Sequence, residues 1–140
     1  MNVCVIYHSD KDNMRQVAEA IAKKCGVKAI DIDRPHNLGD CDLLFVGTTI
    51  QHGRQDTVLM DYLDNLPVNR IKGAAVFSIH RNRLDRTEQA VNLLEHKGIA
   101  VYRDHCVVGE KRSLFRTRVS NEDIRRAIDF ASKVLLAFNG

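Results

Sequence analysis

The stretch that decides the fold is 2–25, NVCVIYHSDKDNMRQVAEAIAKKC. It opens with a continuous apolar run, 3–7, of the length and composition of a strand buried on both faces. After a short polar segment, apolar residues recur at i, i+3, i+4, i+7, i+8 and i+11, starting from Met14. This spacing predicts a helix with one apolar stripe, which begins with a capping box at Asn13 and stops at Gly26. A buried strand followed by such a helix is the repeating unit of an α/β sheet.

The rest of the chain continues to alternate strand and helix signals. Further strands are predicted at 27–32, 43–46, 73–79 and 99–102, the last resuming at 106–108. Helices are predicted to begin after caps at Asp56 or Thr57, Asp85 and Ser120. Strands joined by connections long enough to hold a helix pair in parallel. We therefore predict a parallel sheet, in which only the connection 33–41 is too short for a helix, and we interpret 48–55 and 110–119 as loops.

The composition is that of an ordinary globular protein. The chain has 140 residues, of which 44% are apolar and 28% charged, enough for one domain with a single core. No apolar run approaches the roughly 18 residues that a membrane span needs, and the N-terminus lacks the pattern of a secretory signal. We expect a single domain over 1–140, located in the cytoplasm and not in a membrane.

Positive charge is concentrated in the second half of the chain. Residues 1–70 carry 8 basic and 10 acidic side chains, whereas residues 71–140 carry 13 and 8. The excess falls in two arginine-rich segments, 80–86 and 110–118, which could attract an anion or an acidic partner. Neither a nucleic-acid motif nor interleaved aromatic residues accompany these arginines, so nucleic acid is not an expected ligand.

The four cysteines are widely spaced and include no CxxC pair: Cys4, Cys25, Cys41 and Cys106. This spacing supports neither a zinc site nor a disulfide framework. Free cysteine is among the most buried residue types, so we expect reduced thiols, most of them in the core.

Other uses of an α/β sheet lack their required residues here. A receiver domain needs an Asp at the end of the third strand, where this chain has Gly47 and Thr48. A low-molecular-weight phosphatase needs a Cys in the first loop, but Cys4 falls inside the strand. A cobalamin-binding domain needs a DxHxxG motif, which the chain lacks.

Four segments together resemble the flavodoxin family. IYHSDKDNMRQVAEAIA resembles the first strand, phosphate loop and first helix of a flavodoxin, and DLLFVGTTIQHG resembles its third strand and the loop beside the flavin ring. AAVFSIHRNR resembles the fourth strand with the second ring-side loop, and CVVGE resembles the resumed last strand. The resemblance covers almost the whole chain. It implies an α/β fold of three layers, with a doubly wound, five-stranded parallel sheet of strand order 2-1-3-4-5.

The resemblance also implies a cofactor and a partner. A flavodoxin binds FMN noncovalently and uses it for electron transfer or a flavin-dependent reduction, which implies a redox partner protein. The positions of the phosphate loop and the two ring-side loops imply FMN contacts at Ser9, Asp10, Lys11, Asp12, Asn13, Met14, Thr48, Thr49, Ile50, Gln51, His52, Gly53, Ser78, His80 and Arg81. We predict no catalytic side chain and no metal site.

The charges of the first loop leave a second interpretation open. A phosphate loop binds its dianion through backbone N–H groups, hydroxyls and the helix N-terminus. Asp10 and Asp12 oppose such binding, since two unit charges about 4 Å apart interact by roughly 4 kcal/mol at an effective dielectric near 20. Lys11 and Arg15 would offset part of this repulsion. The alternative is a flavodoxin-fold regulatory or interaction module without FMN, whose arginine-rich segments bind an anionic ligand or an acidic partner.

Overall fold

The opening stretch forms a buried strand and an amphipathic helix in the computed structural model of the chain. The structure describes residues 1–8, 12–51, 54–67, 71–80, 87–109, 111–112 and 117–139. Strand β1 (Val3–Tyr7) is buried from its second residue onward, and helix α1 (Asp12–Cys25) follows it. The apolar stripe of α1 is buried from Met14 to Ala22, as the spacing predicts.

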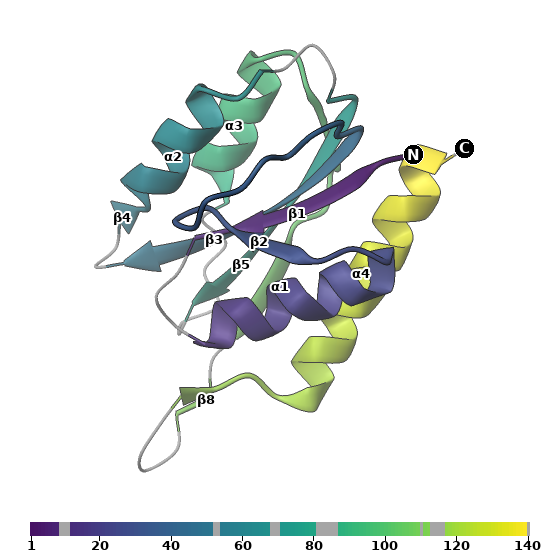
Figure 1. The fold of residues 1–140 in the computed structure, drawn as a ribbon. Coiled ribbons are helices and arrows are strands. Elements are labelled where there is room, and N and C mark those ends of the chain that lie inside the picture. The colour runs from purple at the N-terminus through teal and green to yellow at the C-terminus, as the bar shows by residue number, and fades with distance from the viewer. Residues whose placement is uncertain are drawn as a thin grey trace.

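β1 lies inside the sheet between two parallel neighbours, β2 (Ala29–Asp31) and β3 (Leu43–Gln51). On the far side of β3 lies β5 (Gly73–His80), which is also parallel to it. β6 (Ala100–Val101) and β7 (Cys106–Gly109) pair in parallel with successive halves of β5, so they form one interrupted strand. The strands follow one another in the order β2, β1, β3, β5 and then β6 with β7 (Figure 1). Counted as the five predicted strands, this is the order 2-1-3-4-5, which confirms the predicted parallel sheet.

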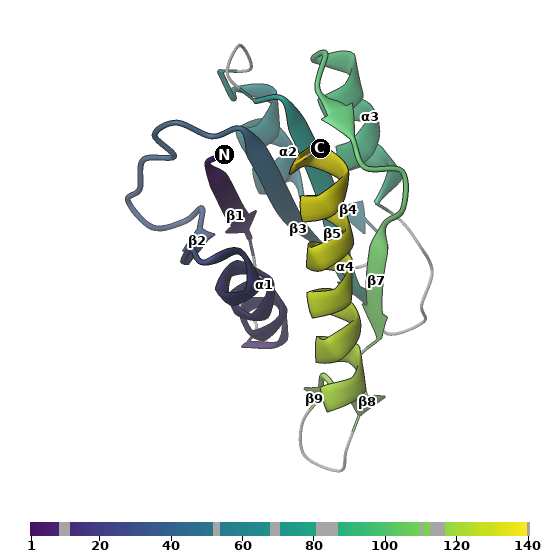
Figure 2. The same cartoon turned by 90° about the vertical axis from the view of Figure 1, so that its right-hand side faces the viewer.

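Helices cover both faces of this sheet and complete three layers. α1 packs beside α4 (Asn121–Asn139) on one face, and α2 (Thr57–Asp64) packs beside α3 (Glu88–His96) on the other, as Figure 2 shows from the side. Successive strand residues point to opposite faces, so Val5 enters the core under α1 and Ile6 enters the core under α2. Each face of the sheet thus has its own apolar core, and the predicted three-layer fold is confirmed.

The predicted capping signals at three helix ends are confirmed, and the one at Asn13 is not. At the start of α4, Ser120 Oγ accepts a hydrogen bond from the Asp123 N–H at 3.1 Å and donates to Asp123 Oδ2 at 2.9 Å. Asp56 caps α2, and Gly26, with φ of 75°, follows the last residue of α1. The capping box predicted at Asn13 is wrong, because α1 already begins at Asp12 and Asn13 lies buried in its first turn.

Two segments predicted as loops contain strands instead. Within 48–55, β3 continues through Gln51 and pairs antiparallel with β4 (Arg54–Gln55). Within 110–119, β8 (Lys111–Arg112) and β9 (Thr117–Arg118) form an antiparallel pair. Backbone hydrogen bonds join these strands, and their residues carry no regular apolar pattern. A prediction from hydrophobic periodicity therefore misses them.

The remaining boundaries differ little from the prediction. β2 is shorter than the predicted strand 27–32, and the connection 33–41 contains no helix, as predicted. α3 begins at Glu88, and the predicted cap Asp85 lies outside the described residues. Of the helices that the structure describes, none combines the length and apolar character needed to cross a bilayer.

Gly47 allows two large side chains to pack against the second half of β3. A Cβ atom at this position would lie 2.6 Å from the Phe77 ring and 2.8 Å from Met14 Sδ, and both side chains are fully buried. A Cβ atom at Gly73 would meet the Phe138 ring at 2.3 Å, but Phe138 is only partly buried, near the end of α4. The neighbour of Gly73 is the closer of the two, but it is also the one with more freedom to move.

We expect Gly47→Ala to lower the free energy of unfolding by about 2 kcal/mol, within the range of roughly 1–3 kcal/mol typical of overpacked cores. Gly73→Ala is the matched control. We expect it to cost less than about 1 kcal/mol, because the partly exposed Phe138 ring can rotate away and alanine restricts the unfolded chain. Urea unfolding at a fixed pH measures both values. Equal losses would contradict the rigidity that we assign to the surroundings of Gly47.

Candidate functional site

The carboxyl ends of the parallel strands gather polar side chains at one edge of the sheet. β1 is followed by His8, β3 carries Thr48, Thr49 and Gln51 near its end, and β5 carries Ser78 and His80. Helix α2 also begins at this edge, after the β3–β4 hairpin (Figure 1). Open parallel sheets bind ligands beyond the carboxyl ends of their strands, so this edge is the candidate site.

His8 joins three separate segments at this edge. Its Nδ1 contacts Asp56 Oδ2, and its Nε2 lies 2.8 Å from Asp33 Oδ2 in the connection after β2. The His8 and Asp56 side chains are 17% and 8% exposed, whereas Asp33 is 60% exposed. Burial disfavours the charged imidazolium, but the hydrogen bonds and charges of Asp56 and Asp33 outweigh burial and raise the pKa of His8 above its usual value.

Asp56 serves two structural purposes at once. Its Oδ1 accepts hydrogen bonds from the backbone N–H groups of Val58 at 3.0 Å and Leu59 at 3.3 Å, which caps α2. Its other carboxylate oxygen, Oδ2, contacts His8. We call Asp33, His8 and Asp56 the His8 network. It ties the end of β1 to the connection after β2 and to the start of α2.

The sequence prediction did not include the His8 network in the site. His8 stands in the first loop but was not among the predicted contacts, and its two partners lie 25 and 48 residues further along the chain. A weak signal was present, since Asp33 follows a predicted strand and Asp56 is a predicted helix cap. Only the strand order brings the three side chains together.

Two buried hydroxyl groups at this edge have no hydrogen-bond partner among the residues that the structure describes. They are Thr49 Oγ1 on β3 and Ser78 Oγ on β5. Thr48 is paired with Ser78, and Thr49 is paired with Ile79. Thr49 and Ser78 therefore lie one position apart along two neighbouring strands. By strand alternation, Thr49 points to the α1 side of the sheet and Ser78 to the α2 side. A buried polar group without a partner costs about 1–3 kcal/mol, which makes these hydroxyls candidates for contacts with a ligand.

The structure places some of the predicted FMN contacts and leaves others outside its description. Asn13, Thr48 and Ser78 are buried, and the side chain of Met14 is 1% exposed and packs into the core. Met14 could therefore meet a ligand only through its backbone. The predicted contacts outside the described residues are Ser9, Asp10, Lys11, His52, Gly53 and Arg81. The backbone, but not the side chain, is described at Asp12, Ile50, Gln51 and His80.

The cysteines are free thiols, and three of them are buried, as predicted. Burial raises the pKa of Cys25 and of Cys106 to about 11, so both stay protonated at neutral pH. The Cys4 thiol donates to the Leu38 carbonyl oxygen at 3.6 Å and the Cys41 thiol to the Leu43 carbonyl oxygen at 3.5 Å. The interaction between these two neighbouring thiols lowers the pKa of Cys4 and raises that of Cys41. Within the described part of the chain, no group of three or more His, Cys, Asp or Glu side chains is arranged to hold a metal ion.

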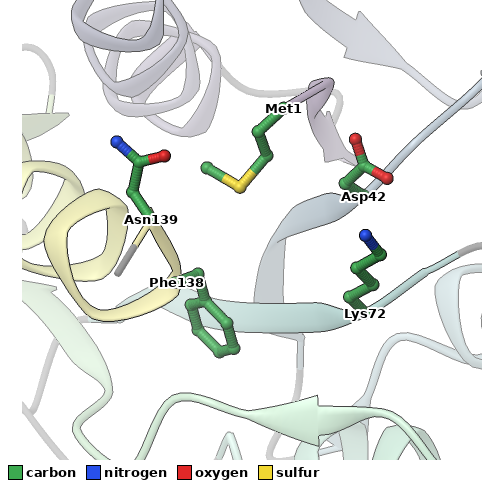
Figure 3. Close-up of a pocket in the computed structure, with 5 residues that line it drawn as sticks. All are labelled: Met1, Asp42, Lys72, Phe138 and Asn139. Atoms are coloured by element: carbon green, nitrogen blue, oxygen red, sulfur yellow. The ribbon is translucent and has the colours of Figure 1, made fainter.

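A pocket of about 320 Å³ lies at the opposite edge of the sheet (Figure 3). It is lined by Met1, Asp42, Lys72, Phe138 and Asn139. These residues come from the amino ends of the strands and from the end of α4. Asp42 Oδ2 already accepts a hydrogen bond from the Asn2 N–H at 2.7 Å. The pocket is therefore separate from the carboxyl edge that carries the His8 network and the two hydroxyls.

No model of a protein family matches the chain, and a search of curated proteins finds no match either. Solved structures do match. Rubredoxin oxygen:oxidoreductase from the anaerobe Desulfovibrio gigas gives a TM-score of 0.78 at 14% identity, over 97% of this chain and 35% of that one. A flavodoxin from the domain Archaea gives a TM-score of 0.73 at 19% identity, over 96% of this chain and 99% of that one. The flavodoxin of Streptococcus pneumoniae TIGR4 gives a TM-score of 0.70 at 18% identity, over 98% of this chain and 99% of that one.

These likenesses show the fold of the chain. It spans about a third of the length of the Desulfovibrio oxidoreductase and nearly all of the two flavodoxins. The fold is flavodoxin-like, in agreement with the strand order.

The His8 network predicts a pH-dependent stability. Because the folded-state pKa of His8 is raised, its contribution is fully present below the unfolded-state pKa of about 6.5 and is lost as pH rises through the folded-state pKa. We expect the stability difference between wild type and His8→Gln to shrink along this interval, measured by urea unfolding at successive pH values.

Two substitutions at Asp56 separate its charge from its cap. Asn caps a helix as well as Asp does, so Asp56→Asn should keep α2 stable. It should reduce the pH-dependent part of the stability that the His8 network contributes. Asp56→Ala should lose the cap as well, at a further cost of about 1 kcal/mol. If the stability difference between wild type and His8→Gln stayed constant with pH, the ion pairs of His8 with Asp33 and Asp56 would be refuted.

Proposed function

We propose that this chain, which has the fold of a flavodoxin, binds FMN noncovalently at the carboxyl edge of its sheet and acts in electron transfer or a flavin-dependent reduction. The observation that carries the proposal is the pair of buried, unpartnered hydroxyls of Thr49 and Ser78 at this edge. Solved flavodoxins that match almost the full length of the chain support it. A redox partner protein belongs to the same proposal.

The residues at the edge suit the two ends of FMN differently. The N-terminus of α1 offers backbone N–H groups and the positive end of a helix dipole to the phosphate. The segments that follow β3 and β5, with His52, Gly53, His80 and Arg81, would flank the ring, and the hydroxyls of Thr49 and Ser78 would donate to it. Bound FMN would supply the electron or hydride chemistry, while the chain orients the ring and sets the charge around it.

The phosphate end is the weaker half of this fit. Asp10 and Asp12 place negative charge on the loop, and Lys11 and Arg15 place positive charge there. Arg15 Nε lies 3.8 Å from Glu19 Oε1 in the next turn of α1, which offsets part of its charge. We therefore expect FMN affinity to be limited by the phosphate and not by the ring.

One observation favours the alternative, a regulatory or interaction module that has lost FMN. The flavodoxin pattern that the first segment resembles ends its phosphate loop with Thr at the position of Met14. Met14 is buried in the core and has no hydroxyl to offer a phosphate. In this case the arginine-rich segments 80–86 and 110–118 would bind an anionic ligand or an acidic partner. FMN binding decides between the two functions.

We expect FMN added to the purified protein to form a yellow complex, with its fluorescence quenched at micromolar protein. Thr49→Val and Ser78→Ala should each weaken FMN binding, because a donor to the ring is lost. They should also leave the FMN-free protein equally stable or more stable, since a buried hydroxyl without a partner is removed.

The matched control is Ser132→Ala, whose hydroxyl donates to the Ile128 carbonyl oxygen on α4 at 3.2 Å. It should leave FMN affinity unchanged. Absence of quenching by wild type, even at high FMN concentration, would reject FMN binding and favour the interaction module.

A second experiment tests the charge of the phosphate loop. We expect Asp10→Thr combined with Asp12→Gly to tighten FMN binding by about a decade or more, because two repulsive carboxylates are removed and each decade corresponds to about 1.4 kcal/mol. The control is Asp61→Asn with Asp64→Asn, two exposed carboxylates on α2, which changes the net charge equally. Titration by fluorescence measures both. Equal effects of the two double variants would show that net charge, and not the loop, controls affinity.

A further inference from the structure

We propose that Cys4 and Cys41 form a redox-active pair, which hydrogen peroxide oxidises to a disulfide that fastens the connection 33–41 to β1. The pair lies near the amino ends of β1 and β3, away from the proposed FMN site, and its oxidation does not require FMN. Both cysteines are free thiols in the structure, and they interact with each other.

Strand pairing brings the two sulfur atoms to the same level of the sheet. Leu43 on β3 is paired with Val3 on β1, and its N–H bonds the Asn2 carbonyl oxygen at 3.1 Å. In a parallel ladder the carbonyl group of the same residue faces the same neighbouring strand. The Cys41 thiol donates to this carbonyl oxygen at 3.5 Å. The Cys41 sulfur therefore lies on the β1 side of β3, beside the residue that follows Val3, which is Cys4.

The Cys4 side chain points toward the same place. Like Ile6, it lies in the core on the α2 side of the sheet, and Cys41 belongs to that core as well. Its thiol donates to the Leu38 carbonyl oxygen at 3.6 Å, three residues before Cys41. A disulfide needs Cβ atoms about 3.5–4.5 Å apart. Because the two thiols already interact, we expect side-chain rotation to form the bond without a shift of either strand.

The two sulfur atoms differ in reactivity. The interaction with Cys41 lowers the pKa of the Cys4 thiol, whereas the interaction with Cys4, together with burial, raises the pKa of Cys41. The thiolate is the reactive form of cysteine, so Cys4 is the nucleophile and Cys41 keeps its proton. Burial raises the pKa of Cys25 and Cys106 to about 11, which keeps both as unreactive thiols at neutral pH.

Oxidation of the pair takes two steps. The Cys4 thiolate attacks one oxygen of hydrogen peroxide, the O–O bond breaks, and hydroxide leaves, so that Cys4 becomes a sulfenic acid. The Cys41 sulfur then attacks the Cys4 sulfur, the S–S bond forms, and the S–O bond breaks. The second hydroxide takes the Cys41 proton, and the first takes the proton that Cys4 released. One peroxide is thus reduced to two waters, while the two sulfur atoms lose two electrons.

The connection 33–41 controls access to the pair. Cys4 and Cys41 are only 7% and 3% exposed, so peroxide needs an opening to reach them. The connection returns from β2 to β3 along the α2 side of the sheet (Figure 1). A hydrogen bond of 2.8 Å between His36 Nε2 and the Tyr62 hydroxyl holds it to α2. Irregular segments open at a lower free energy than core strands, so we expect this connection to admit the oxidant.

The test treats the folded 140-residue chain with hydrogen peroxide at neutral pH, alkylates the remaining thiols and maps the disulfides by peptide mass spectrometry. We expect one bond, between Cys4 and Cys41, which dithiothreitol reverses by thiol–disulfide exchange. Cys25 and Cys106 should be recovered in alkylated form. Absence of the bond between Cys4 and Cys41, or formation of a different bond in its place, would overturn the proposal.

Serine variants separate the two roles. Cys41→Ser lacks the second sulfur, so sulfenic acid should accumulate at Cys4 and react with dimedone, whereas Cys4→Ser should give no adduct at Cys41. Cys106→Ser is the matched control and should form the bond as wild type does. Cys106 is 5% exposed, much like Cys4, but the groups that act on its pKa are Arg126 and Asp123. An adduct at Cys41, or none at Cys4, would overturn the proposal.

A variant of α2 tests the part played by the connection. Tyr62→Phe keeps the ring but loses the hydrogen bond to His36. We expect the disulfide to form about two- to tenfold faster, the factor that corresponds to one hydrogen bond. Tyr102→Phe is the control, because Tyr102 packs against Phe130 at the core on the other face of the sheet. It should leave the rate unchanged. Equal rates for the two variants would overturn the role of the connection.

Discussion

Parallel pairing between the main strands of the central sheet decides where this chain can bind a ligand. β1 pairs in parallel with β2 and β3, and β5 pairs in parallel with β3 and with both parts of the last strand. Every main strand therefore ends at the same edge, and helix N-termini gather there as well. The other edge collects the amino ends of the strands and the pocket beside Met1 and Asn139.

The same pairing places polar groups directly above an apolar floor. Along β3 the sequence changes from Val46 through Gly47 to Thr48, and β5 changes from Phe77 to Ser78 at the same level. The floor is rigid, because Phe77 and Met14 fill the space that a side chain at position 47 would need. Neither hydroxyl has a hydrogen-bond partner in the described part of the chain. A ligand that presents acceptors to Thr49 or Ser78 would gain hydrogen bonds without displacing existing ones.

The strands and helices of the core could be predicted from sequence because their signals are local. The stripe that begins at Met14 and the cap at Ser120 each involve residues within a few turns. The β3–β4 hairpin was missed because its strands are joined by backbone hydrogen bonds and not by an apolar pattern. The resemblance included Thr49 and Ser78 in the site, but their lack of partners depends on burial. The His8 network joins residues up to 48 positions apart, a distance at which no periodicity can reveal a contact.

The helix caps bear on where an anion could bind. At α2, the N–H groups of Val58 and Leu59 already bond Asp56, a carboxylate of the chain itself. At α4, the N–H of Asp123 is bonded by Ser120. A phosphate would have to displace these caps to bind either helix, and at α2 it would also meet the negative charge of Asp56. We propose the start of α1, and not that of α2 or α4, as the place for the phosphate. His8 contacts Asp56 at the start of α2, so the His8 network ties the end of β1 to a helix N-terminus whose N–H groups are already bonded.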